Sequence, residues 1–319
     1  MSATSLTSNQ PWWQRAWRWC FAIEPMAHAW WETLIMRGVI AWATLITLWH
    51  TAPFTSQPQP HGLAAWGADF TWLGNGALTP SLRIVLGVSL VLYVCRVLPA
   101  LTLLPALVAS FGLGVLGNSQ GAIGHATQIV TTVLLLQWLA YAWALLRPCV
   151  GRSLPQEYNG DQLAADWARQ GVAATYVVSA ISKLIESEGN WIADTPYFGL
   201  QIVKSNNMGF YDWLAPRTEG FGAAAGQWFV DHPWMAMVLF GAALPLELFA
   251  FIGLHNRRAA LAFGVALFGF HSIVTEFMQL GFLYHKMLLV ALFVNPAWWL
   301  VQGAKRIFAA GWRGRETPA

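Results

Sequence analysis

The sequence predicts an all-α polytopic membrane protein, and its composition points to this fold class in two ways. Hydrophobic residues make up 56% of the 319 residues, while charged residues make up only 10%. A soluble domain carries about 25% charged residues, so this chain has too few to cover a surface exposed to water. The 20 tryptophans agree with this class, because indole rings favour the interface between membrane and water.

Apolar stretches of roughly 17–25 residues are long enough to cross a bilayer as helices. The sequence contains about eight such stretches, which we expect to form one bundle. They lie near residues 36–54, 81–97, 99–117, 125–146, 169–186, 234–254, 258–279 and 284–303. The second and third stretches meet at residues 96–99, which predicts a tight turn. The long connection 187–233 is expected to fold as short interfacial helices or as a lid.

The two ends of the chain differ in character from the apolar stretches. Residues 12–21 combine tryptophans with arginines, a pattern typical of a helix lying in the membrane surface and not of a signal peptide. We therefore divide the chain into an interfacial amphipathic segment (1–33), a transmembrane domain (34–303) and a basic cytoplasmic tail (304–319).

The positions of the basic residues predict the orientation, because cytoplasmic loops are enriched in Lys and Arg. With the N-terminus inside, the cytoplasmic segments carry Arg15, Arg18, Arg37, Arg96, Arg147, Arg152, Arg169, Arg257, Arg258, Lys305, Arg306, Arg313 and Arg315. The opposite side keeps Arg83, Lys204 and Arg217 in loops, with Lys183 and Lys286 near helix ends. Both termini are therefore expected in the cytoplasm. Cys20, Cys95 and Cys149 then lie near the reducing face, where thiols stay free.

Several function classes lack support in the sequence. The net charge of +3 is small and no Lys/Arg tract is present, so we expect no nucleic-acid partner. The chain contains no P-loop, GxGxxG or GxSxG motif, which argues against nucleotide-driven pumping and serine hydrolase chemistry. No HExxH or similar metal-ligand spacing occurs either, and we predict no metal.

The most informative single residue is Lys183, which lies inside the apolar segment 170–185. A lysine within a membrane helix costs several kcal/mol unless it pairs, snorkels or faces a wet cavity. Burial favours the neutral amine, and a neutral amine can act as a base. The alternative is a lysine at a helix end whose ammonium reaches the membrane surface.

Other polar residues fall at a similar depth in this topology. They are His125 at the start of the fourth stretch, His271 and Glu276 in the seventh, and His285 and Lys286 at the start of the eighth. Each alone can be a structural group, but their convergence with Lys183 predicts a proton-handling site. A metal site formed by the three histidines and Glu276 is the alternative. Glu247, two residues after Pro245, can be a functional or a local structural group.

Three blocks of sequence together resemble a known family. The blocks are Trp167-Ala168-Arg169-Gln170 with Tyr176 to Leu184 and Trp191; Gly117-Asn118-Ser119 to His125; and Phe270-His271 with Leu280-Gly281-Phe282 and Asn295-Pro296. In order and spacing they resemble the vitamin K-dependent gamma-carboxylase-like membrane domain, also called the horizontally transferred transmembrane (HTTM) domain.

The resemblance implies a chemistry and a set of residues. Lys183 would be the base that deprotonates a reduced quinone, and His125 and His271 would line the reaction chamber. Asn118, Tyr176 and Trp191, which belong to these blocks, would contact the quinol, and we expect Glu276 and His285, from the polar groups at a similar depth, to contact it as well. It further implies molecular oxygen as a reactant, carbon dioxide where carboxylation is retained, and a site on the periplasmic side of a bacterial inner membrane.

The sequence also departs from the family in two places. The carboxylase follows its membrane domain with a large soluble domain, whereas this sequence ends shortly after Pro296. The family's paired lysines are Ser182-Lys183 here. We therefore expect a quinol-dependent oxidoreductase or carboxylase-like lyase in contact with membrane lipid. The alternatives are a non-catalytic membrane factor for the maturation, export or immunity of a small peptide, and a transporter.

Overall fold

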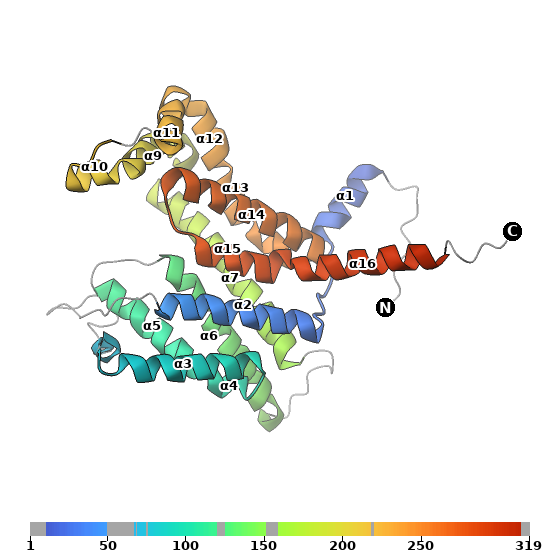
Figure 1. The fold of residues 1–319 in the computed structure, drawn as a ribbon. Helices are drawn as coiled ribbons and strands as arrows, with labels where there is room; N and C mark the ends of the chain where they lie inside the picture. Colours follow the sequence, from blue (N-terminus) through green and yellow to red (C-terminus); the bar gives the residue numbers. More distant parts are fainter. Residues whose placement is uncertain are drawn as a thin grey trace. The chain divides into compact units, whose positions relative to one another are not determined.

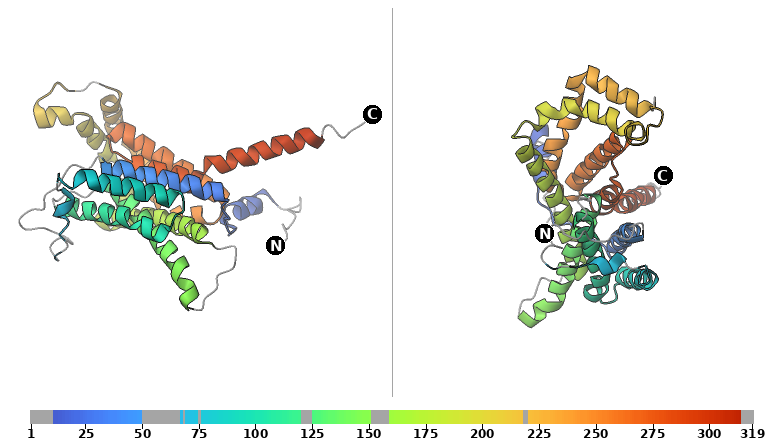
Figure 2. Two further views of the ribbon diagram at one scale, coloured as in Figure 1. Left: turned by 60° about the horizontal axis from the view of Figure 1, so that its bottom comes forward. Right: turned by 90° about the vertical axis from the view of Figure 1, so that its left-hand side faces the viewer.

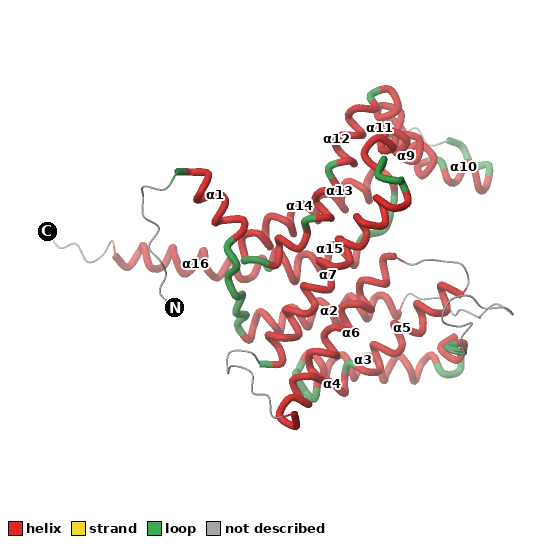
Figure 3. Tube along the Cα trace, turned by 180° about the vertical axis from the view of Figure 1, so that it is seen from behind, coloured by secondary structure: helices red, strands yellow, loops and turns green. Residues whose placement is uncertain are grey.

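The computed structural model describes residues 11–49, 67, 69–74, 76–119, 125–150, 159–217 and 220–313. Within these residues every regular element is a helix, as the tube in Figure 3 shows. The all-α class that the sequence predicts is therefore confirmed for the described part of the chain.

Five helices among the described residues are long and apolar enough to cross a membrane, which makes the chain a polytopic membrane protein. The number rises to six if the helices Phe221–Asp231 and Pro233–Leu248, bent by 108°, form one broken span. The five are Trp30–Trp49, Pro99–Ser119, Thr127–Cys149, Arg257–Met278 and Leu283–Ile307. The apolar helix Thr79–Val94 is shorter. The total of about eight spans stays a prediction.

The chain divides into two compact units, whereas the sequence predicts a single bundle. One unit contains residues 1–26 and 172–282, and the other contains residues 27–171 and 283–319. Helix α7 (Gly160–Glu186) contributes to both units. With 27 residues it is about 40 Å long, so its two ends can pack in different units.

The unit of residues 27–171 and 283–319 is a bundle of apolar helices, several of which run side by side (Figures 1 and 2). Its elements are α2 (Trp30–Trp49), η2 (Thr71–Gly74), α3 (Thr79–Val94), α4 (Pro99–Thr102), α5 (Leu104–Ser119), α6 (His125–Leu146), η3 (Arg147–Val150), the first part of α7, α15 (Leu283–Leu289), the π-helix η6 (Val290–Val294) and α16 (Pro296–Arg313). Large side chains from different helices fill its core, among them Ile40, Tyr93, Leu103 and Leu134, which are fully buried.

The turn between α3 and α4 is short, and its backbone is unusual. Arg96 and Leu98 both have positive φ angles, 64° and 43°, a region that side chains with a Cβ rarely occupy. Pro99 then begins α4, where a fixed φ suits the first helical turn. The chain therefore reverses direction within residues 95–98.

A buried carboxylate joins this turn to three helices. Asp161, in the first turn of α7, forms ion pairs with Arg37 of α2 at 2.9 Å and with Arg96 at 3.0 Å. The hydroxyl of Tyr141 on α6 also donates to Asp161 at 2.9 Å. The side chains of Arg37 and Asp161 are each only 7% exposed. Because an isolated charge is costly in such a place, this cluster holds α2, α6 and α7 together.

The unit of residues 1–26 and 172–282 contains one long helix and many short ones. Its elements are α1 (Trp12–Phe21), the second part of α7, α8 (Trp191–Asp194), η4 (Thr195–Tyr197), α9 (Phe198–Asn206), α10 (Met208–Trp213), α11 (Phe221–Asp231), α12 (Pro233–Gly241), α13 (Ala243–Leu248), η5 (Ala250–Leu254) and α14 (Arg257–Met278). The connection 187–233 is therefore built of short helices.

Helix α1 is attached at the beginning of α14. The side chain of Asn256 caps α14 by accepting from the N–H groups of Arg258 and Ala259, and it donates to the carbonyl of Ala22 at 3.0 Å. Trp12 and Trp17 are 75% and 64% exposed. Exposed tryptophans suit a helix at the membrane surface, although the placement of α1 there stays a prediction.

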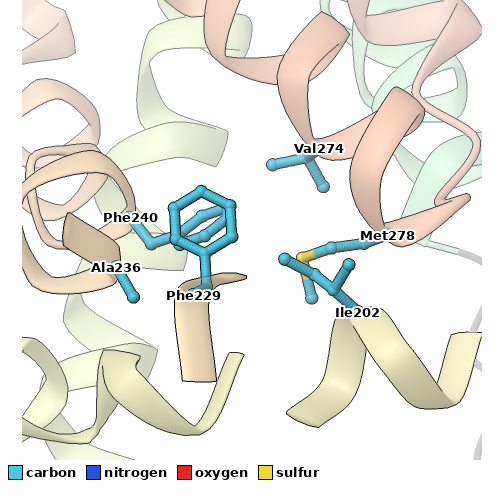
Figure 4. Close-up of a cluster of buried hydrophobic side chains, with 6 residues drawn as sticks. All are labelled: Ile202, Phe229, Ala236, Phe240, Val274 and Met278. Atoms are coloured by element: carbon cyan, nitrogen blue, oxygen red, sulfur yellow. The ribbon is translucent and has the colours of Figure 1, made fainter. Parts of the chain in front are cut away.

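Two glycines allow α9 and α11 to pack closely. A Cβ atom on Gly199 would lie 2.8 Å from the backbone nitrogen of Val230, and one on Gly226 would lie 2.8 Å from that of Val203. No larger residue fits at these crossings. Beside them, side chains from α9, α11, α12 and α14 face one another in an apolar cluster (Figure 4), formed by Ile202, Phe229, Ala236, Phe240, Val274 and Met278.

The span predicted over 234–254 is not one helix. The chain forms α12, breaks at Ala242, and continues as α13 and the 3-10 helix η5. Pro245 contributes to this difference, because it lacks the N–H that would continue the hydrogen-bond ladder. The last predicted span, 284–303, is also interrupted, by a π-helix and by Asn295 with a φ of 44°. The predicted span 169–186 lies within the longer α7.

Candidate functional site

The candidate site is built on one face of α7. Tyr176, Ser179 and Lys183 are three and four residues apart, so their side chains point to the same side of the helix. The remaining partners come from α8, α13 and α14, all within the unit of residues 1–26 and 172–282. The sequence places these polar groups in apolar segments, and the tertiary fold supplies their partners.

Lys183 forms an ion pair with Glu247 of α13. The Glu247 side chain is 4% exposed and the Lys183 side chain 21% exposed. The Ser179 hydroxyl donates to the same carboxylate oxygen at 3.4 Å. Burial of two opposite charges together avoids the cost of an isolated charge in an apolar segment.

An indole ring covers the ammonium group. The Nζ atom of Lys183 lies 5.3 Å from the centre of the Trp191 ring, within the range of a cation–π contact. Trp191 in turn packs edge-on against Phe198, with ring centres 5.3 Å apart. Its indole N–H is buried and has no hydrogen-bond partner in the described part of the protein. A bound molecule with an acceptor oxygen would satisfy this group.

A second polar pair lies on the same face of α7. The hydroxyl of Tyr176 and Nε2 of His271 on α14 are 2.7 Å apart, and both residues are 3% exposed. The His271 ring stacks on Phe282 with ring centres 4.4 Å apart. Since either ring nitrogen of a histidine can donate or accept, this pair can pass a proton in either direction.

The other residues that the sequence predicts lie on α5, α6, α14 and α15. Glu276 is exposed on α14, Asn118 is exposed near the end of α5, and His285 is buried in α15. His125 is the first residue of α6, and its side chain lies outside the described part of the structure. Asn118 and His285 belong to the other compact unit. The convergence of these residues with Lys183 therefore stays a prediction.

No group of three His, Cys, Asp or Glu side chains among the described residues could hold a metal ion. The alternative of a metal site on the three histidines and Glu276 includes His125, whose side chain lies outside the described residues, and it therefore stays untested.

Sequence reasoning did not find the partner of Lys183. Glu247 stands out in its apolar stretch, and a single acid and a single base within apolar helices are a signal for pairing. Its distance of 64 residues from Lys183 hides the contact. Asp161 was missed altogether, because it lies in a polar stretch at the start of α7 that resembles an ordinary loop and helix start.

Comparison with protein-family models, with curated proteins and with solved structures finds no match for this chain.

Proposed function

We propose that this protein is a membrane enzyme whose Lys183–Glu247 pair removes a proton from a quinol-type lipid. The observation that carries the proposal is the ion pair itself, in which a buried carboxylate meets a partly exposed lysine whose ammonium lies over an indole ring. The resemblance to the gamma-carboxylase membrane domain supports a quinol as the substrate class. We also propose that the protein lies in a bacterial inner membrane, with about eight spans, both termini in the cytoplasm and a site that faces the periplasm.

The chemistry begins with the quinol hydroxyl. In place of the Lys183 base that the resemblance implies, the carboxylate of Glu247 takes the hydroxyl proton, and the ammonium of Lys183 stabilises the negative oxygen that remains. Electrons then pass to molecular oxygen. In the simplest balanced reaction, two electrons and two protons leave the quinol, and quinone and hydrogen peroxide are formed. A carboxylation would in addition require carbon dioxide and a carbon acid.

The Tyr176–His271 pair has a supporting role in this proposal. Its 2.7 Å hydrogen bond lies on the face of α7 that carries Lys183, so it can accept the second proton of the quinol. The indole N–H of Trp191 can donate to a quinol oxygen and orient the ring.

Turnover of reduced quinones tests the proposal. Purified protein in nanodiscs receives menaquinol or ubiquinol, and oxygen uptake and quinone products are followed by mass spectrometry. We expect turnover by the wild type and its loss in Lys183→Met and Glu247→Gln. Lys204→Met is the matched control, because Lys204 is exposed on α9. Absence of turnover with either quinol in a folded protein would refute the proposal.

A second function is favoured by the surface of the segment 187–233. Trp213 and Leu214 at the end of α10 are each 84% exposed, and Phe221 is 75% exposed. Exposed aromatic groups of this kind mark sites for protein or peptide contact, as a factor for peptide maturation, export or immunity would need. If this function is correct, Trp213→Ala abolishes activity in cells while Lys183→Met does not.

A further inference from the structure

A groove with a volume of about 490 Å³ lies between α5 and α6. This volume falls in the usual range for small-molecule sites. Its wall carries five side chains that can form hydrogen bonds, and no charged residue lines it. The five are Ser110, Asn118, Gln128, Thr131 and Thr132. Polar groups are costly on a membrane helix unless something bonds to them.

The polar groups at the bottom of the groove are already satisfied. Ser110 and Thr131 share a hydrogen bond of 2.6 Å, and the Thr132 hydroxyl donates to the carbonyl of Gln128 at 3.0 Å. The amides of Asn118 and Gln128 are different, because both side chains are exposed. These two amides are therefore the groups that a bound molecule would reach first.

The groove runs along α5 and α6, and its two ends differ in chemistry. Asn118 is the last residue but one of α5, and Gln128 lies one turn after the start of α6. Ser110 and Leu135 lie about 10–12 Å deeper than these two amides at 1.5 Å per residue, which is roughly a third of a hydrocarbon core of about 30 Å. The amide end thus lies at the helix ends, and Phe111 and Leu135, both 42% exposed, border the deeper part.

We propose that this groove binds one amphiphile of the membrane, with its uncharged head at Asn118 and Gln128 and its chain against Phe111 and Leu135. A neutral head fits because no cation lines the groove to bind a phosphate. The assignment of the amphiphile to the quinol class rests on the proposed function. The groove belongs to the unit of residues 27–171 and 283–319, and its lining includes none of the residues described at the Lys183 site.

A helix from a second copy is the competing occupant. Helices that associate in membranes approach closely through stripes of small residues. Here Gly114 is bordered by the large exposed side chains of Phe111 and Leu135, which would hold another helix away. A groove of this kind therefore accommodates one hydrocarbon chain better than it accommodates a helix.

The test fills the groove without disturbing the fold. A Cβ atom on Gly114 would meet nothing within 4 Å, so Gly114→Leu places a side chain in the open groove. Gly87→Leu is the matched control, because Gly87 on α3 is equally open and does not line the groove. The probe is a photoreactive quinone with an isoprenoid chain, added to protein in nanodiscs. Labelled peptides are located by mass spectrometry after illumination.

We expect the wild type, Gly87→Leu and Lys183→Met to be labelled within residues 110–135, and Gly114→Leu to lose this label. Excess menaquinone should remove the label, and excess phosphatidylglycerol should not. Labelling that survives Gly114→Leu, that phosphatidylglycerol removes equally well, or that is replaced by cross-links between two copies would overturn the inference.

The same experiment separates this inference from the proposed function, because labelling is measured without turnover. If the wild type oxidises quinol but its groove is not labelled, only the inference that the groove binds an amphiphile is overturned. A labelled groove in a wild type that oxidises no quinol would overturn the proposed function alone.

Discussion

Lys183 and Glu247 form an ion pair between α7 and α13, and their side chains are buried to different degrees. The Glu247 side chain is 4% exposed, whereas the Lys183 side chain is 21% exposed. The carboxylate is therefore the member that depends more on its partner, because the ammonium can still reach water.

This asymmetry predicts the order of two substitutions. Lys183→Met leaves a buried carboxylate alone and should lower the free energy of unfolding by about 3–5 kcal/mol. Glu247→Gln should cost less, because the remaining ammonium is partly solvated. Thermal unfolding in detergent, followed by circular dichroism, measures both. The double variant Lys183→Met/Glu247→Gln should recover stability but not turnover; a double variant less stable than Lys183→Met would contradict this account.

The Tyr176–His271 hydrogen bond predicts a second effect on stability. Tyr176→Phe removes the hydroxyl and leaves a buried imidazole nitrogen without this bond, which should cost about 1–3 kcal/mol. Tyr197→Phe is the control, because Tyr197 is 68% exposed and should change stability by less than about 0.5 kcal/mol. Equal unfolding temperatures for the two variants would show that the bond contributes nothing.

Asp161 forms ion pairs with one buried and one exposed arginine, and the two pairs should contribute differently to the free energy of unfolding. Asp161→Asn leaves the guanidinium of Arg37 buried beside a neutral amide, so we expect a loss of about 3–5 kcal/mol. Arg96→Gln removes a side chain that is 56% exposed, and should cost no more than about 1 kcal/mol. Chemical unfolding curves of both variants in the same detergent provide the comparison. A larger loss in the free energy of unfolding for Arg96→Gln than for Asp161→Asn would contradict this expectation.

The crossing of α9 and α11 predicts different outcomes for two glycines. Gly226→Ala would bring a Cβ atom to 2.8 Å from the backbone of Val203, and the helices would have to separate at a cost of about 1–3 kcal/mol. Gly209→Ala meets only Ala215 at 3.7 Å and should be neutral or stabilising by about 0.5–1 kcal/mol. Limited proteolysis of the segment 187–233 measures the separation. Equal protection of the two variants would exclude a tight crossing.

Several helices could be predicted from the sequence, because their apolar runs are about as long as the membrane is thick. The stretch predicted at 125–146 has the bounds of α6, and the stretch at 258–279 differs from α14 by one residue at each end. The predictions were poorer where a backbone break decides the structure. The break at Ala242 between α12 and α13 and the π-helix before Asn295 leave apolar composition unchanged, so a search for apolar runs does not detect them.

The sequence also singled out Lys183 and His271 as candidate site residues, since a polar group in an apolar run is visible without a structure, and it pointed to Tyr176 through the resemblance to the carboxylase family. Their partners were not visible. Glu247 is 64 residues from Lys183, and His271 is 95 residues from Tyr176. Phe282, which stacks on His271, belongs to a turn whose position depends on how α14 ends.

By itself the sequence determined that this is a membrane protein and which polar groups lie in its apolar helices, because both follow from local composition. Only the tertiary structure decided that Lys183 is paired with Glu247, that Tyr176 meets His271, and that Asp161 joins Arg37 to Arg96. The physical reason is that a buried charge or hydroxyl must be satisfied by whichever group lies next to it in space. That neighbour is set by helix packing, for which a single sequence carries no direct signal.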